Sequence, residues 1–76
     1  MSQTFEFYDA RAKEAAAEAE AAVLDNVRER ARRSEATWRA LAEQARAVAE
    51  ERARVEQDKA ARRAEAVLED EVGTPH

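Results

Sequence analysis

The chain has 76 residues, no cysteine, one histidine and a formal net charge of −4, and 39% of its residues are charged. A chain of this length forms at most one small domain, and the absence of cysteine excludes disulfides and thiolate metal sites. It has no apolar run near the roughly 20 residues that span a bilayer and no signal-peptide pattern at its N-terminus. We therefore expect one cytoplasmic helical domain over residues 1–76, with no membrane association.

The composition indicates helices. Most of the 45% hydrophobic fraction is alanine, and the chain contains one glycine and one proline. A mixture dominated by Ala, Glu and Arg is typical of long helices and coiled coils. Large apolar side chains are few, so one chain alone would be weakly stabilised. We therefore expect the chain to self-associate.

The first predicted helix covers about residues 5–23. Thr4 can act as its N-cap, with Glu6 in the first turn. Apolar residues recur at spacings of three and four, the pattern of a helix packed on another helix. This first seam consists of Phe5, Tyr8, Ala12, Ala15, Ala19 and Ala22. Phe7 lies off the seam.

A second seam begins one residue out of phase with the first, and it consists of Val27, Ala31, Ser34, Trp38, Leu41, Ala45, Val48, Arg52 and Val55. The phase slip predicts a turn at about Leu24–Asn26. Asn26 followed by Glu29 matches a capping box, although Asp25 can serve as the cap instead. The predicted fold is all-α: an antiparallel helical hairpin with coiled-coil-like packing, whose helices cover about 5–23 and 26–70.

Two alternatives to this hairpin stay open. Ser34 is another possible N-cap, so the chain could turn there, although the second seam crosses Ser34 without a change of phase. A single long helix from Phe5 to about Asp70 is also compatible with the absence of glycine and proline from that interval. Coiled coils tolerate phase slips of the observed kind.

Folding the chain about Asp25 brings particular residues together. Trp38 would lie opposite Ala12, and Tyr8 would lie near Leu41, so that large side chains meet small ones. Residues 1–27 hold 2 basic and 6 acidic side chains, and residues 28–63 hold 11 and 7, so an acidic helix would lie beside a basic one. The predicted hairpin core consists of Phe5, Tyr8, Val27, Trp38 and Leu41.

The first helix ends opposite about residue 46, which leaves the rest of the second helix without a partner in the chain. Apolar residues continue there, and the predicted interaction residues are Phe7, Val48, Val55, Val67 and Leu68. Gly73 is expected to end the helix, with a disordered tail over residues 73–76. We expect the partner to be a second copy, forming a homodimer, or another helical protein.

No pattern in the chain predicts catalysis. The single histidine, His76, lies in the predicted tail, where it cannot act as a positioned base. Carboxylate pairs such as Glu14 and Glu18 lack the Glu-x-x-His motif of helical di-metal sites, and a two-helix unit hardly encloses a pocket. We therefore expect no enzyme activity, no cofactor, no metal site and no small-molecule substrate.

The densest cluster of cations is a basic patch formed by Arg28, Arg30, Arg32 and Arg33. Such a patch can bind phosphate backbones. The patch equally suits arginines that flank an acidic first helix, and the net acidity counts against a nucleic-acid partner. Binding to nucleic acid or to the ribosome is therefore the alternative function.

Three stretches, Phe7–Glu14, Asn26–Arg30 and Trp38–Glu43, resemble small bacterial helical-hairpin proteins that open with a (Phe/Tyr)-Tyr-x-x-Arg-Ala-x-Glu pattern. The resemblance covers residues 5–45 and implies a turn near Asp25, with an aromatic residue and a leucine on the second helix. It implies no activity, because no function is assigned to such proteins. The sequence as a whole predicts a small non-enzymatic helical module for protein–protein interaction or regulation.

Overall fold

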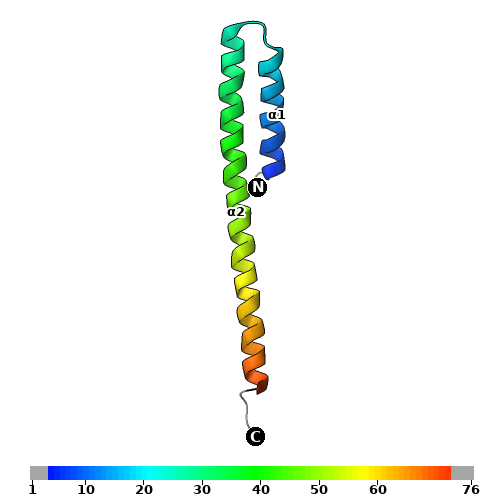
Figure 1. The fold of residues 1–76 in the computed structure, drawn as a ribbon, viewed down its shortest axis with the longest axis vertical. Helices are drawn as coiled ribbons and strands as arrows, with labels where there is room; N and C mark the ends of the chain where they lie inside the picture. The colour runs from blue at the N-terminus through cyan, green and yellow to red at the C-terminus, as the bar shows by residue number, and fades with distance from the viewer. Residues whose placement is uncertain (1–3, 73–76) are drawn as a thin grey trace.

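The computed structural model describes residues 4–72, which form two α-helices packed against each other. Helix α1 spans Phe5–Ala21 and helix α2 spans Asp25–Val72. Figure 1 shows them antiparallel on either side of one turn, with α2 extending far past the start of α1. The predicted all-α hairpin with a long second helix is confirmed. The alternatives of a single helix and of a turn at Ser34 are wrong, because Ser34 lies inside α2. The predicted tail at residues 73–76 lies outside the described residues.

Helix α1 begins where its sequence predicts. Thr4 adopts an extended backbone (φ −87°, ψ 166°), and its Oγ1 accepts a hydrogen bond of 3.3 Å from the N–H of Phe7. This bond satisfies one of the unpaired N–H groups at the start of the helix. At the other end, the Ala22 N–H donates to the Ala19 carbonyl at 3.3 Å. The last turn of α1 contains no basic residue of its own.

The turn is closed by Arg28, which reaches back from the first turn of α2. Its Nη2 donates a hydrogen bond of 2.9 Å to the Ala22 carbonyl, and its Nη1 donates one of 2.9 Å to Asp25 Oδ1. The guanidinium thus places a positive charge at the negative end of the α1 dipole. This one side chain ties the end of α1 to the start of α2.

The predicted capping box at the start of α2 does not form. Helix α2 begins at Asp25, so Asn26 already lies within it, and Glu29 pairs with Arg33 at 3.2 Å instead. The Arg28 N–H bonds the Leu24 carbonyl at 3.0 Å. The chain therefore turns through Ala22–Leu24, slightly earlier than the predicted Leu24–Asn26, because the contacts of Arg28 favour the earlier start.

The contact line between the two helices consists of alanine. The fully buried residues are Ala12, Ala15, Ala19, Ala31 and Ala42. Methyl side chains on this line let two helices approach closely, and the larger side chains then cover the edges of the contact. Of the predicted core, Tyr8, Val27, Trp38 and Leu41 are half-buried, and Phe5 is 36% exposed.

One predicted position on the contact face of α2 is wrong. Ser34 is exposed, and the side chain of Glu35 lies in its place, only 15% exposed. A helix of 3.6 residues per turn drifts relative to a strict seven-residue repeat. The face that packs on α1 therefore moves from Ala31 through Glu35 and Trp38 to Ala42.

The molecule is a thin rod measuring 81 × 20 × 12 Å. The 48 residues of α2 correspond to about 72 Å of helix, whereas the 17 residues of α1 correspond to about 26 Å. Every residue from 46 to 71 is exposed. We refer to residues 50–71 as the free segment of α2, because α1 does not cover them (Figure 1).

Candidate interaction surface

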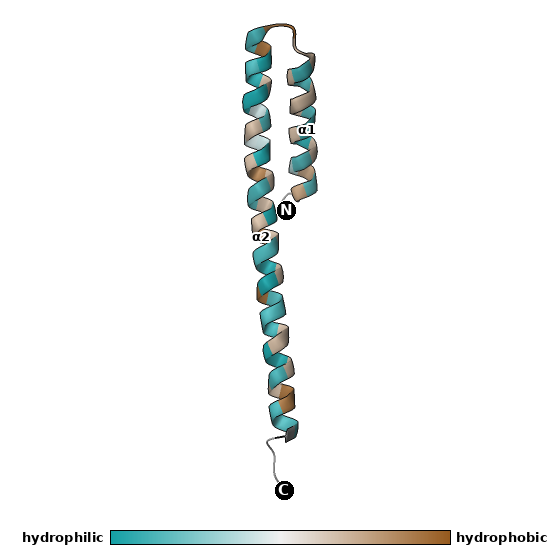
Figure 2. Cartoon of the chain, viewed as in Figure 1, coloured by the Kyte–Doolittle hydropathy of each residue, from teal (hydrophilic) through white to brown (hydrophobic). Residues whose placement is uncertain are grey.

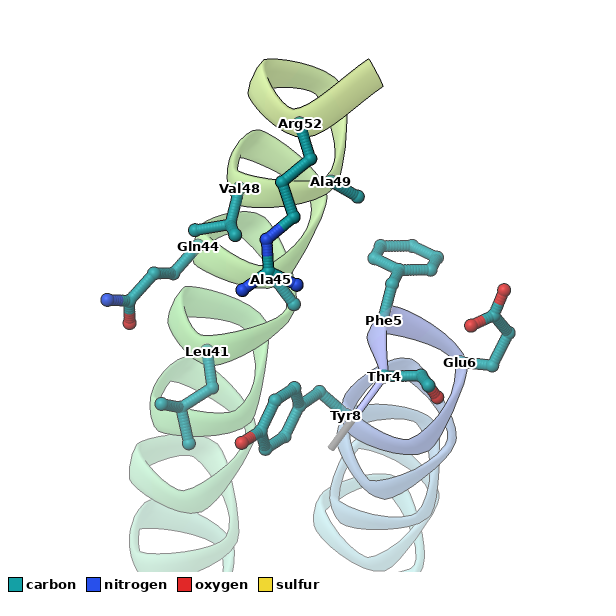
Figure 3. Close-up of a pocket in the computed structure, with 10 residues that line it drawn as sticks. All are labelled: Thr4, Phe5, Glu6, Tyr8, Leu41, Gln44, Ala45, Val48, Ala49 and Arg52. Atoms are coloured by element: carbon teal, nitrogen blue, oxygen red, sulfur yellow. The ribbon is translucent and has the colours of Figure 1, made fainter. Parts of the chain in front are cut away.

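An apolar groove opens where α1 begins beside α2. It has a volume of about 750 Å³, and its walls include Phe5, Tyr8, Leu41, Val48, Ala49 and Arg52. Figure 3 shows the Tyr8 side chain extending from α1 toward Leu41 on α2, and Phe5 beside Ala45 and Ala49. The groove lies beside the first turns of α1, where α2 continues past Phe5. It is an open step between two helices, with no cluster of catalytic groups.

Three aromatic rings and one cation hold this end of the hairpin together. The Tyr8 ring stacks on Trp38 at a centroid distance of 6.1 Å, and Phe7 meets Trp38 edge-on at 6.2 Å. The Arg11 guanidinium carbon lies 5.1 Å from the centre of the Trp38 ring. Each such pair contributes about 0.5–1.5 kcal/mol. The cluster covers the edge of the alanine contact line.

Phe7 therefore has a role that the spacing pattern did not reveal. The sequence predicts it as an interaction residue off the seam, and its side chain is 40% exposed. Its ring nevertheless packs on Tyr8 at 5.6 Å and on Trp38. Long side chains on a helix lean toward its N-terminus and cover neighbouring positions, so an aromatic residue beside a seam can still reach across it.

The other predicted interaction residues lie exposed on α2. The side chains of Val48 and Val55 are 43% and 38% exposed, and those of Val67 and Leu68 are 58% and 60% exposed. Figure 2 shows apolar colour in separate patches along α2 rather than in one continuous stripe. These four residues therefore do not form one common face.

The basic patch is mostly engaged within its own helix. Arg28 is tied to the turn, Arg32 pairs with Glu35 at 3.0 Å, and Arg33 pairs with Glu29 at 3.2 Å. Within residues 4–72, Arg30 is the member of the patch without an ion pair. The nucleic-acid hypothesis stays a prediction, which a binding titration at low ionic strength would test.

Within residues 5–69, the charged side chains of α1 and α2 form no ion pair across the interface. The ion pairs within residues 5–69 join positions three or four apart in one helix, such as Lys13 with Asp9 and Arg62 with Asp58. Pairs of this kind support a helix by a few tenths of a kcal/mol each. They explain how α2 stays helical where nothing in the chain packs against it.

Two carboxylates on α2 have lowered pKa values, which favours their charged form. Hydrogen bonds from Arg39 and then Arg32 lower the pKa of Glu35, and the Arg46 hydrogen bond lowers the pKa of Glu43. Glu43 in turn raises the pKa of Arg46, with Glu50 adding to the effect. These groups stay ionised around neutral pH. Their hydrogen bonds join residues three or four apart in α2 and support the helix.

The turn carries two exposed apolar residues that sequence reasoning missed. Val23 is 89% exposed and Leu24 is 61% exposed. The available signal was Leu24, a large aliphatic residue inside the predicted turn, where polar residues are usual, with Val23 directly before it at the predicted end of the first helix.

The described part of the chain has neither a candidate metal site nor a helix that could span a membrane. Residues 4–72 contain no group of three or more potential metal ligands. Neither helix combines the length and apolarity required to cross a membrane over the same residues. The chain matches no protein-family model, no curated protein and no solved structure. Its resemblance to small bacterial helical-hairpin proteins therefore stays an interpretation of the sequence.

Proposed function

We propose that the protein is a non-enzymatic helical interaction module that self-associates through α2. One observation carries this proposal. Every residue from 46 to 71 is exposed, although the same stretch holds Val48, Val55, Val67 and Leu68. About 33 Å of helix (the 22 residues of the free segment) therefore has no neighbour in the chain.

Energetics support a partner for this helix. Isolated helices are marginal in water, and tertiary packing supplies most helix stability in proteins. The core within one chain consists of alanines, whose burial contributes far less than the 1.5–3 kcal/mol or so of a buried Val or Leu side chain. Covering part of this exposed apolar surface, such as Val48 and Val55, with a second helix would supply apolar burial that one chain lacks.

The function would be exercised through helix–helix contacts of the coiled-coil kind. An exposed α2 next to an apolar groove can bind another helix without a large change of shape in the hairpin. The homodimer is the form that we propose, with another helical protein as the alternative partner. The cytoplasmic location expected from the sequence stays a prediction.

Sedimentation velocity on the full chain, over a concentration series through the micromolar range, tests the proposal. We expect the sedimentation coefficient to rise with concentration toward that of a dimer. Circular dichroism on the same samples shows whether the chain is helical in each. A fully helical monomer at every concentration would contradict self-association.

A further inference from the structure

We infer that the partner is a second copy whose α2 packs antiparallel on a stripe formed by Leu41, Val48 and Val55, centred near Val48. This inference rests on the proposed function and specifies its surface and its orientation. It selects one of several exposed apolar patches.

The stripe is defined by helix geometry. Successive members are seven residues apart, slightly less than two turns, so neighbours lie about 20° apart around the α2 axis and the whole stripe covers about 40°. Thr37 and Lys59 each lie eleven residues from Val48, about three turns, and extend the same face. The stripe runs into the groove beside α1, because Leu41 and Val48 both line that groove with Tyr8 and Phe5 (Figure 3).

The apolar pair near the end of α2 does not belong to this face. Leu68 is 20 residues from Val48 and points about 200° away, to the opposite side of the helix. Val67 points about 100° away. A straight partner helix that covers Val48 and Val55 therefore leaves Leu68 exposed. This separation makes Leu68 a matched control for the stripe.

Helix α1 leaves the stripe open and forms one side of the docking site. The α2 residues that pack against α1, Ala31, Trp38 and Ala42, lie about 80–120° around the axis from Val48. In a helical bundle, one helix packs against neighbouring helices on two adjacent faces, and the residues between those two faces become part of the buried core. If the α2 of a second copy packs on the stripe, it buries the α2 residues between the stripe and the face that contacts α1. Phe5 and Tyr8 would then lie beside it.

The charge pattern selects the antiparallel direction. Residues 28–33 contain four arginines and one glutamate, a charge of +3, whereas residues 64–71 contain four acidic residues and no basic one, a charge of −4. Pairing about Val48 places residue 30 opposite residue 66, and residues 25–32 of one copy opposite residues 64–71 of the other. Residues 25–32 contain three arginines, Asp25 and Glu29, a charge of +1, so the acidic end meets a stretch of positive charge. A parallel dimer would align like charges at both ends, which is unfavourable.

Arg30 makes the charge argument specific. It lies 18 residues before Val48, five full turns, and so on the stripe side of α2. Ala66 lies five turns after Val48, with Glu69 less than one turn beyond it. In the antiparallel dimer the Arg30 guanidinium, which has no ion pair within residues 4–72, would lie within reach of Glu69 of the second copy.

Cysteine cross-linking tests the orientation, because the chain has no cysteine of its own. The full chain would be prepared as Val48→Cys, Thr37→Cys, Lys59→Cys and, as the control, Leu68→Cys, each with wild-type helicity by circular dichroism. A disulfide requires Cα atoms about 4.4–6.8 Å apart. Residues 37 and 59 are 22 positions apart, or about 33 Å along the helix, so cross-links at these two positions report direction, whereas a cross-link at Val48 reports only that the stripe is the interface.

We expect Val48→Cys to form a disulfide dimer on oxidation, and the mixture of Thr37→Cys with Lys59→Cys to form a mixed dimer. Thr37→Cys alone, Lys59→Cys alone and Leu68→Cys should stay uncross-linked. Val48→Glu should weaken association by about tenfold or more, because a buried valine is replaced in both copies. Leu68→Glu should change it less than about twofold.

Each other outcome identifies which claim fails. Disulfides within Thr37→Cys and within Lys59→Cys would show a parallel dimer and overturn the inference, while leaving the proposed self-association in place. Association that Val48→Glu does not weaken, with no cross-link on the stripe, would place the interface elsewhere and overturn it too. A wild-type chain that stays monomeric in sedimentation would overturn the proposed function itself.

Discussion

At the scale of single residues, Arg28 has the most concentrated structural role. It bonds the Ala22 carbonyl and the Asp25 carboxylate at once, across the turn. Hydrogen bonds from charged groups contribute more than neutral ones. We expect Arg28→Ala to lower the free energy of unfolding by about 1–2 kcal/mol, as measured by urea unfolding followed by circular dichroism.

Arg30→Ala provides the matched control, because Arg30 makes no ion pair within residues 4–72. Its effect on the unfolding of the dilute monomer should stay within about 0.5 kcal/mol. Equal losses from the two substitutions would show that removal of any arginine, rather than the contact at the turn, lowers stability.

Glu35 predicts the direction of the pH dependence. Arg39 and Arg32 lower its pKa below the usual 4.5, so the folded chain binds fewer protons than the unfolded chain in this range. The stabilisation is fully present above pH 4.5 and is lost as the pH falls through the lowered pKa. We expect the thermal midpoint to fall on acidification below that pH, and to fall less in Glu35→Gln.

The matched control for this change is Glu56→Gln, since Glu56 has no ion pair within the described residues. It should keep the wild-type pH dependence in the same thermal melts. A Glu35→Gln variant that loses stability on acidification as steeply as wild type would refute the role of Glu35. The pKa of Glu43 is also lowered, so Glu43 adds to the loss of stability on acidification. It would account for the pH dependence that remains in the Glu35→Gln variant.

At the scale of the helices, the close approach of α1 and α2 depends on alanine. Ala15 is 4% exposed on the contact line, whereas Ala17 is exposed two positions further on. A leucine at position 15 would force the helices apart, and overpacking of this kind costs about 1–3 kcal/mol. We expect Ala15→Leu to destabilise the hairpin by that amount in urea unfolding, and Ala17→Leu to be close to neutral. If both variants unfolded in urea like the wild type, the two helices would not pack as closely as the line of buried alanines predicts.

Helix periodicity and the phase slip were sufficient to predict two helices and the position of the turn to within a few residues. Both signals depend on which positions are apolar, and they predict the structure correctly wherever apolar burial determines the packing. They could not predict the contact of Arg28 with the Ala22 carbonyl, because this contact depends on where the guanidinium reaches in space. Seven-residue spacing also placed Ser34 inward, whereas the 3.6-residue helix turns Glu35 to that side.

The candidate surface was predictable in position but not in shape. The sequence predicted that α2 extends beyond the start of α1. It also predicted the valines and the leucine that lie exposed on this extension. The sequence prediction grouped Val48 with Leu68, although the 3.6-residue repeat places them on opposite sides of α2. Phe7 was included as well, because its contact with Trp38 depends on side-chain direction rather than on spacing.

At the scale of the whole molecule, the segregated charges should determine how two rods align. The Debye length is about 10 Å at an ionic strength of 0.1 M, far shorter than the 81 Å rod. Each charge therefore interacts only with charges close to it. The order of the acidic and basic stretches along the chain affects the alignment of the two copies more than the net charge of −4 on each chain does. An antiparallel pair brings Arg30 of one copy near Glu69 of the other, twice in each dimer.

A charge swap measures this contribution in the full chain. Arg30→Glu should weaken self-association about fivefold, because two exposed contacts of roughly 0.5 kcal/mol each are lost. Adding Glu69→Arg to the same chain should restore most of the affinity, since opposite charges would again meet in the antiparallel pair. In a parallel pair each position would meet its own copy, so Glu69→Arg would give no rescue. Sedimentation equilibrium on the wild type and the single and double variants therefore distinguishes the two alignments through the affinity alone, without cross-linking.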